Sequence, residues 1–164
     1  MRRIGIIAVL SLMALALAAV PALAQSGHFV GTPTAGPVAN NGTLPISGKV
    51  AGLGGTAFEI TASSTANAEY ACQNKGGNFP SDPKKQAESG QVTASTGPLA
   101  TTRNGQYNFS LTLSPPATTL VCPKGQRAVL TSVAYGPVTL TLLEDNVVSD
   151  TTIISGASRT FFTV

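Results

Sequence analysis

Residues 70–80, YACQNKGGNFP, place a cysteine, a lysine, two glycines and two asparagines within one short run. Successive backbone N–H groups at such glycines could form a nest that holds an anion, with lysine ammonium groups beside it. The candidate binding loop therefore comprises Lys75, Gly76, Gly77, Asn78, Lys84 and Lys85. The alternative, which we favour, is a surface loop whose glycine and asparagine residues serve positive φ angles. If the chain binds a ligand, this loop is the first place to look.

Cys72 and Cys122 are the only cysteines, and 50 positions separate them. In a chain with an export signal, described below, an even cysteine count makes one disulfide the default. A redox pair would need the C-x-x-C spacing, which is absent, and a zinc site would need more ligands than two cysteines and one histidine. We therefore predict a structural Cys72–Cys122 bridge, which stabilises the fold by ~4 kcal/mol in the chain-entropy account.

Catalytic groups are scarce. His28 is the only histidine and lies in a terminal segment, which is a poor place for the base of a Ser–His–acid triad. The seven acids offer no recognisable glycosidase pair. Asp145, Asn146 and Asp150 could bind calcium, but their spacing matches no calcium loop and hairpin tips use these residues anyway. We predict no catalytic residue, no metal site and no cofactor, and hence a non-enzymatic protein.

The N-terminus has the three-part pattern of a secretory signal peptide over residues 1–24. Arg2 and Arg3 are followed by an apolar run, 4–20, and then by the small residues of Ala22-Leu23-Ala24. We expect cleavage after Ala24, although the run is also close to the ~20 residues of a membrane anchor. The general secretion route is favoured over twin-arginine export. The predicted location is extracellular or in the cell envelope.

The full chain has ten basic and seven acidic residues. Loss of Arg2 and Arg3 with the signal would leave eight basic residues, so the exported chain is almost neutral. It contains no basic stripe with interleaved aromatic residues, which argues against nucleic acid as a partner. No second apolar span follows, so we expect no membrane span after cleavage.

Short alternating segments dominate the rest of the chain. Tyr107, Phe109, Leu111 and Leu113 alternate with polar residues, as half-buried antiparallel strands do. Residues 25–42 are rich in glycine and proline and are predicted to be a flexible lead-in with an edge strand at 28–30. Further strands are expected at residues 44–50, 58–62, 99–102, 106–113, 129–135, 138–142, 152–154 and 158–164.

Turn residues separate these strands. Asn104-Gly105 tolerates positive φ and is predicted to make a hairpin between residues 99–102 and 106–113. Residues 144–146 look like a second hairpin tip, and Gly136-Pro137 interrupts a strand. The expected fold for residues 43–164 is all-β: one immunoglobulin-like Greek-key β-sandwich of about seven strands. A small barrel is the alternative.

The stretches CQNKGGNFP, CPKGQ, VAYGPVTLT and SGASRTFF resemble an uncharacterised family of small secreted proteins, mostly bacterial. Its members pair C-x-N-x-G-G-N with a later C-P-x-G-Q, and the similarity covers about residues 56–164. The resemblance implies a secreted β-sandwich with one disulfide, and it implies no activity and no site residues.

We therefore expect a secreted protein that acts by binding, or as an envelope or matrix component. Its partner would be another extracellular protein, a cell-surface component or a second copy of itself. One alternative is a subunit of an extracellular fibre, in which the lead-in is donated to an exposed edge strand of a neighbour. Another alternative is a secreted hydrolase or an enzyme inhibitor.

Overall fold

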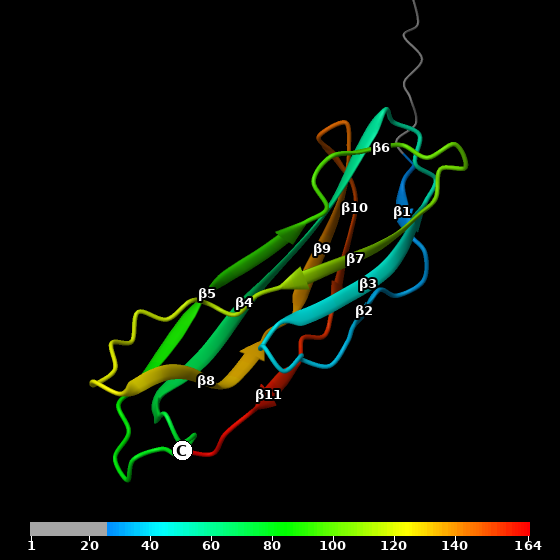
Figure 1. Cartoon of the computed structure of the whole chain (residues 1–164). Coiled ribbons are helices and arrows are strands. Elements are labelled where there is room, and N and C mark those ends of the chain that lie inside the picture. The colour runs from blue at the N-terminus through cyan, green and yellow to red at the C-terminus, as the bar shows by residue number, and fades with distance from the viewer. Residues whose placement is uncertain (1–25) are drawn as a thin grey trace, which may run out of the picture.

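A computed structural model describes residues 26–164, and this part of the chain is all-β. Its strands form two separate antiparallel sheets packed as a sandwich (Figure 1). No helix among the described residues is long and apolar enough to cross a membrane. The prediction of a signal peptide at residues 1–24, with cleavage after Ala24, lies outside the described residues.

The smaller sheet is built around β3 (Leu44–Ala51). One edge of β3 pairs with two short strands, β1 (His28–Phe29) and β2 (Thr34–Ala35). The other edge pairs with β7 (Tyr107–Leu113) over seven consecutive positions. The alternation of Leu44, Ile46 and Val50 places all three in the core, because successive strand residues point to opposite faces.

The larger sheet is built around β4 (Ala57–Asn74), a strand of 18 residues. Such a strand is about 60 Å long. One edge of β4 pairs with β5 and β6, and the other edge with β8 and β9, which pair in turn with β11 and β10. The bounds are β5 (Lys85–Ser95), β6 (Leu99–Ala100), β8 (Gln126–Tyr135), β9 (Val138–Glu144), β10 (Val147–Ile154) and β11 (Ser158–Thr160).

β8 and β9 run along the same edge of β4 and are separated by Gly136-Pro137, as the sequence predicts. The buried positions change parity there: Val133 and Tyr135 are buried before the break, and Val138 and Leu140 after it. β10 and β11, which pair with β9 and β8, are separated by a break at the same position along the sheet. At that break, a Cβ on Gly156 would lie only 2.0 Å from the Tyr135 carbonyl oxygen, so only glycine fits there.

The core lies between the two sheets. Phe29 and Phe109 meet edge to face at 5.9 Å, and Phe58 and Tyr107 at 5.2 Å between ring centroids. Figure 1 shows that the smaller sheet covers only one half of the elongated larger sheet. Over the other half, residues 114–125 lie against the sheet: Leu120 is buried and the Tyr70 hydroxyl donates to the Pro116 carbonyl at 2.6 Å.

The all-β sandwich is confirmed, with eleven strands instead of about seven. The alternative of a single closed sheet is wrong, because the strands form two open sheets. The hairpin predicted at Asn104-Gly105 is also wrong. The turn itself exists, with Gly105 at φ +60°, but β6 before it pairs with β4 and β7 after it pairs with β3. The turn therefore leads from one sheet to the other.

Residues 26–42 lie along the sandwich. The edge strand predicted at 28–30 corresponds to β1, and Phe29 and Val38 are part of the core. Side chains of the larger sheet also hold this segment: Asp150 accepts from the Phe29 N–H at 2.8 Å, and Arg159 donates to the Val38 carbonyl at 2.8 Å. This segment, predicted as a flexible lead-in, thus contributes both strand pairing and core residues.

Candidate functional site at the disulfide end

Cys72 and Cys122 form a disulfide, with 5.6 Å between their Cα atoms, as predicted. Cys72 is fully buried near the end of β4, and Cys122 lies in the irregular segment before β8. The bridge therefore fastens residues 114–125 to the uncovered half of the larger sheet. The bridge also fixes the position of the chain that leads into β8. Two basic residues, Lys124 and Arg127, lie on this stretch.

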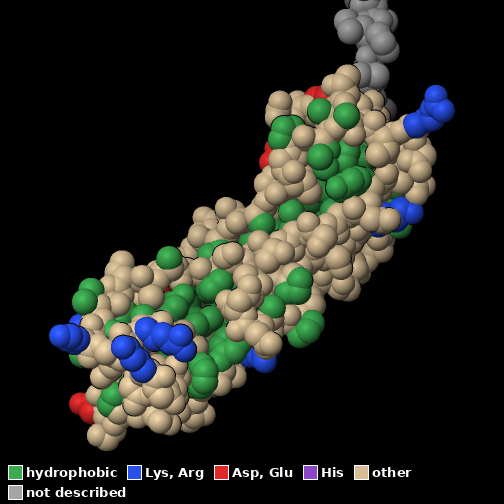
Figure 2. Space-filling model, viewed as in Figure 1, with side chains coloured by type: hydrophobic (Ala, Val, Ile, Leu, Met, Phe, Trp, Pro, Cys, Tyr) green, Lys and Arg blue, Asp and Glu red, His purple; other side chains and the backbone are tan. Residues whose placement is uncertain are grey.

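Five basic residues gather at this end: Lys75, Lys84, Lys85, Lys124 and Arg127. We call them the cationic end. Strand register brings them together, because Ala71 pairs with Lys85 and Gln73 with Arg127 on opposite edges of β4. All five are exposed, and Figure 2 shows basic side chains gathered at this tip. Within residues 26–164 none of them pairs with an Asp or Glu carboxylate, and Asp82 is the only acid in segments 71–85 and 118–127.

The predicted binding loop is a tight turn at the end of β4. Gly77 adopts φ +80°, which favours glycine, and its N–H donates to the Asn74 carbonyl at 3.1 Å. The Asn78 N–H donates to the Asn74 side chain at 3.0 Å. Two of the three N–H groups expected to form an anion nest, those of Gly77 and Asn78, are thus bonded within the turn. An anion site here would therefore depend mainly on the ammonium groups and not on a complete backbone nest.

Two of the lysines are partly fixed by hydrogen bonds. The Lys84 ammonium donates to the Val121 carbonyl at 2.9 Å, and the Lys85 ammonium donates at 2.6 Å to the main-chain oxygen of Val164, the last residue of the sequence. A carbonyl acceptor orients an ammonium group but does not neutralise its charge. The positive charge of Lys84 is therefore positioned by the Val121 carbonyl without being neutralised.

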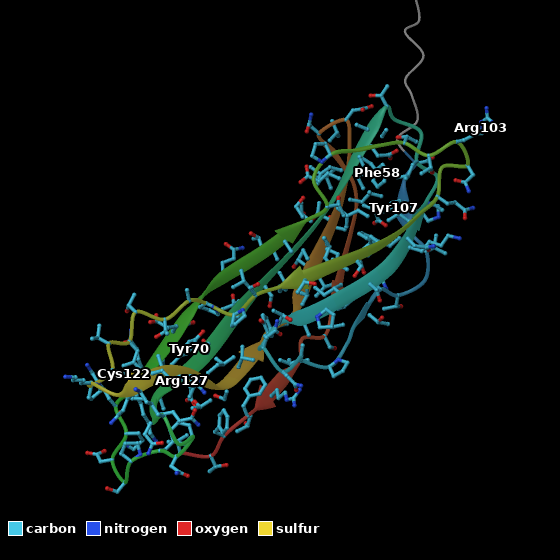
Figure 3. All side chains as sticks on the ribbon, in the orientation of Figure 1. Phe58, Tyr70, Arg103, Tyr107, Cys122 and Arg127 are labelled. Atoms are coloured by element: carbon cyan, nitrogen blue, oxygen red, sulfur yellow. A yellow bond between two sulfur atoms is a disulfide. The ribbon has the colours of Figure 1, made fainter. Side chains whose placement is uncertain are left out.

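Lys75 and Arg127 line one shallow hollow of about 390 Å³ together with Gln73, Gly125 and Gln126. Gly125 adopts φ +84° there, which lets the chain turn into β8. Figure 3 places Arg127 and Cys122 at the same end of the molecule, far from Arg103. The hollow offers two cations and two amide side chains, which are groups that bind carboxylate, sulfate or phosphate oxygens.

A second hollow, of about 420 Å³, is lined by residues of β4, β5, β8 and the C-terminal segment, among them Tyr70, Lys85 and Phe162. Burial, together with the nearby Glu88 carboxylate, raises the pKa of Tyr70. Because its hydroxyl also donates to Pro116, Tyr70 keeps its proton and serves as a structural contact.

Carboxylates at the opposite end bind backbone groups. Glu144 is fully buried and accepts from the N–H groups of Gly27 and Gly54, at 2.9 and 2.8 Å, and from the Ser149 hydroxyl. Burial acts to raise the pKa of Glu144, but these bonds outweigh it and the pKa is lowered. The pKa of Asp145 is lowered by the Thr56 hydroxyl and by backbone N–H groups.

The carboxylates of Asp145 and Asp150, which were considered as calcium ligands, both accept hydrogen bonds from backbone N–H groups and are already used in the fold. Among residues 26–164, no three His, Cys, Asp or Glu side chains lie close enough together to hold a metal ion. His28 lies in β1, with its Nδ1 2.9 Å from the Ser26 carbonyl.

Comparison of the chain with protein-family models, with curated proteins and with solved structures finds no match. The candidate site therefore depends on geometry alone. Sequence reasoning named Lys75, Lys84 and Lys85 but missed Lys124 and Arg127, which join them only through strand register. The signal that could have found them is the CPKGQR stretch, where two cations follow a cysteine already predicted to be bridged to Cys72.

Proposed function

We propose that this is an exported, non-enzymatic binding module whose cationic end binds an anionic polymer of the cell envelope or extracellular matrix. Export is supported by the signal pattern of residues 1–24 and by the disulfide, which suits an oxidising compartment. We assign the sandwich to the immunoglobulin-like class, and the chain to the secreted family that its cysteine motifs resemble.

The observation that carries the proposal is the set of five exposed cations at one disulfide-held end, none of which pairs with an Asp or Glu carboxylate. A folded protein gains nothing in stability from gathering like charges, because they repel one another. Such a cluster raises the local concentration of anions and steers them to the surface. A linear polyanion fits better than a small anion, because the cations are spread over both sides of β4.

The test is affinity for heparin, a sulfated polysaccharide, with neutral dextran as the comparison. Lys124→Gln/Arg127→Gln removes one lysine and one arginine from the cationic end. Lys49→Gln/Arg103→Gln removes the same charges elsewhere. Each exposed cation is worth up to ~1 kcal/mol, so we expect the first variant to bind about tenfold more weakly and the second to bind almost normally. Binding should also weaken with added salt, which screens exposed charges.

Equal weakening by the two variants would mean that only net charge matters, and it would contradict a localised site. Absence of binding both to heparin and to the carboxylated polysaccharide alginate would contradict the proposed function as a whole. Circular dichroism on each variant separates lost binding from lost folding.

A further inference from the structure

β5 is an edge strand with a free side. It pairs with β4 through eleven consecutive positions, and it pairs with no other strand among residues 26–164. The phase of its hydrogen bonds follows from its two ends, where the Cys72 N–H donates to the Lys84 carbonyl and the Thr96 N–H to the Ile60 carbonyl. Even-numbered residues thus bond to β4. The backbone groups of the odd-numbered residues point outward without a strand partner.

The usual protection of an edge strand is missing from residues 89–95. Edge strands are commonly blunted by shortness, bulges, proline or charge. β5 is eleven residues long, its register with β4 is continuous, and residues 89–95 contain no charge and no proline. The opposite edge is protected: β10 carries a register shift between Val148 and Asp150, and β1 lies beside it.

We propose that β5 pairs with β5 of a second copy of this chain, antiparallel about a two-fold axis at Gly90. In this register all six residues of β5 whose backbone groups point away from β4 find partners. Lys85 lies opposite Ser95 of the second copy, and Ser89 lies opposite Gln91. Gly90 meets its own copy on the axis at a non-hydrogen-bonded pair, where Cα atoms approach most closely. A Cβ on Gly90 meets nothing within 4 Å in the single chain, so the space is open.

Charge complementarity favours this register. Ser95 donates to the Glu59 carboxylate on the outer face of the sheet, the face on which Lys85 also lies. The Lys85 ammonium of one copy therefore comes within reach of the Glu59 carboxylate of the other. No two like charges face each other, because Glu88 lies opposite Val92. A two-fold contact of this kind closes on itself and gives a dimer and nothing larger.

The dimer depends on β5 alone and stands whether or not the cationic end binds a polyanion. If it does bind, the two proposals combine. β5 runs from Lys85 at the cationic end to Ser95 toward the other end, so antiparallel pairing places the two cationic ends at opposite extremes of the dimer. The assembly then has two binding ends that cannot reach the same short segment of polymer.

Light scattering after size-exclusion chromatography tests the proposal on the purified protein. We expect wild type at twice the chain mass. Thr93→Pro removes one outward N–H and leaves the bonds to β4 intact, and edge strands tolerate proline at such positions. This variant should run as a monomer with an unchanged circular dichroism spectrum, whereas Thr93→Ala, which keeps the N–H, should remain dimeric.

Gly90→Cys tests the register in a protein that keeps its edge. It should form a covalent dimer under mild oxidation, and Val148→Cys on the protected edge should not. A monomeric wild type, a dimer that survives Thr93→Pro, or higher polymers that depend on residues 26–42 would each overturn the proposal. The last result would favour the strand-exchange fibre. Because heparin binding is measured separately, failure of the dimer leaves the proposed function standing, and the reverse also holds.

Discussion

Glu144 lies at the end of β9 and accepts hydrogen bonds from three separate parts of the chain: the N-terminal segment, the turn before β4, and β10. Asp145 and Asp150 act in the same way on neighbouring backbone N–H groups. At the level of residues the two ends therefore differ in kind. Carboxylates at one end hold the fold together, while the cations at the other end are left to solvent.

Glu144→Ala should destabilise the protein strongly, because it leaves the N–H groups of Gly27, which is buried, and of Gly54 without an acceptor. Hydrogen bonds to charged groups are worth about 1.5–3 kcal/mol each, so we expect a loss of roughly 3 kcal/mol or more in the free energy of unfolding. Urea denaturation measures it. Asp82→Ala, which removes an exposed carboxylate with no hydrogen bond in the described part of the chain, is the control and should change little.

The lowered pKa of Glu144 predicts a pH dependence. A carboxyl whose pKa is lower in the folded state adds stability above its unfolded pKa and loses it as the pH falls through the folded value. Wild-type stability should therefore decrease below about pH 4.5, the ordinary value for glutamate. Glu144→Gln should be less stable than wild type at pH 6, and the difference should shrink as the pH falls below about 4.5. Parallel curves would show that other groups account for the slope.

Removing the disulfide with Cys72→Ala/Cys122→Ala should lower the free energy of unfolding by about 4 kcal/mol. Because Cys122 lies in the irregular segment that covers half of the larger sheet, that segment should also become open to proteases. Limited trypsin digestion should then cut at Lys124 or Arg127 much faster than in wild type. Cleavage that begins instead at Lys49 in β3 would mean that the whole sandwich, and not this end, had loosened.

At the level of elements, two glycines in the larger sheet make a matched pair. Gly156 lies at the β10–β11 break, where a Cβ would meet the carbonyl oxygens of Tyr135 and Gly136 at 2.0 and 2.1 Å. Gly156→Ala should destabilise the fold by about 3 kcal/mol, since backbone must move to make room. Gly90→Ala in β5 meets open space and should be neutral or slightly stabilising. Thermal unfolding of both variants is the measurement, and equal effects would contradict the break as a packing constraint.

The strands that sequence reasoning found are those with a clear apolar face. β7 is predicted almost residue for residue, because Phe109, Leu111 and Leu113 alternate with polar residues and pack on the core. β5 was missed: its residues 85–90 were interpreted as loop because small and polar side chains, with Gly90 among them, carry no such pattern. In β4 an alternating apolar pattern was recognised only at 58–62, since its later inward positions are Ala66 and Ala68, which give a weak apolar signal.

The disulfide could be predicted from composition and the export signal, because only two cysteines exist. The lysines near Cys72 could be predicted because they are close in sequence. Arg127 could not, since its place beside Gln73 depends on the register of β4 and β8. That register includes a shift between Glu69 and Tyr70, which no local pattern indicates. The burial of Glu144 was missed for the same reason: hairpin tips usually expose their acids, and its donors are distant in sequence.

Over the whole molecule, charge is distributed unevenly along the long axis. The cationic end has five basic residues against Asp82, while the other described residues have three basic against six acidic. The described residues are nearly neutral in total, with eight basic against seven acidic, yet they carry a large charge asymmetry along the long axis. In the two-fold dimer Lys85 of one copy lies opposite Ser95 of the other, so the two Lys85 positions are separated by ten strand residues, about 33 Å, and Lys75 and Arg127 lie farther out at each end.

This geometry predicts crosslinking and not only binding. A dimer with two cationic ends should join separate heparin chains, because its two ends cannot reach the same short segment of polymer. Mixtures of the dimer with heparin should therefore turn turbid near charge balance. The monomeric Thr93→Pro variant keeps its cationic end and should bind immobilised heparin as one end of the wild-type dimer does. It should nevertheless leave the solution clear, because it has only one such end. Lys124→Gln/Arg127→Gln should remain dimeric and also leave it clear, because its ends bind weakly. Turbidity from the monomeric Thr93→Pro variant would show that a single cationic end suffices to gather polymer, and the two-ended dimer would then have no part in it.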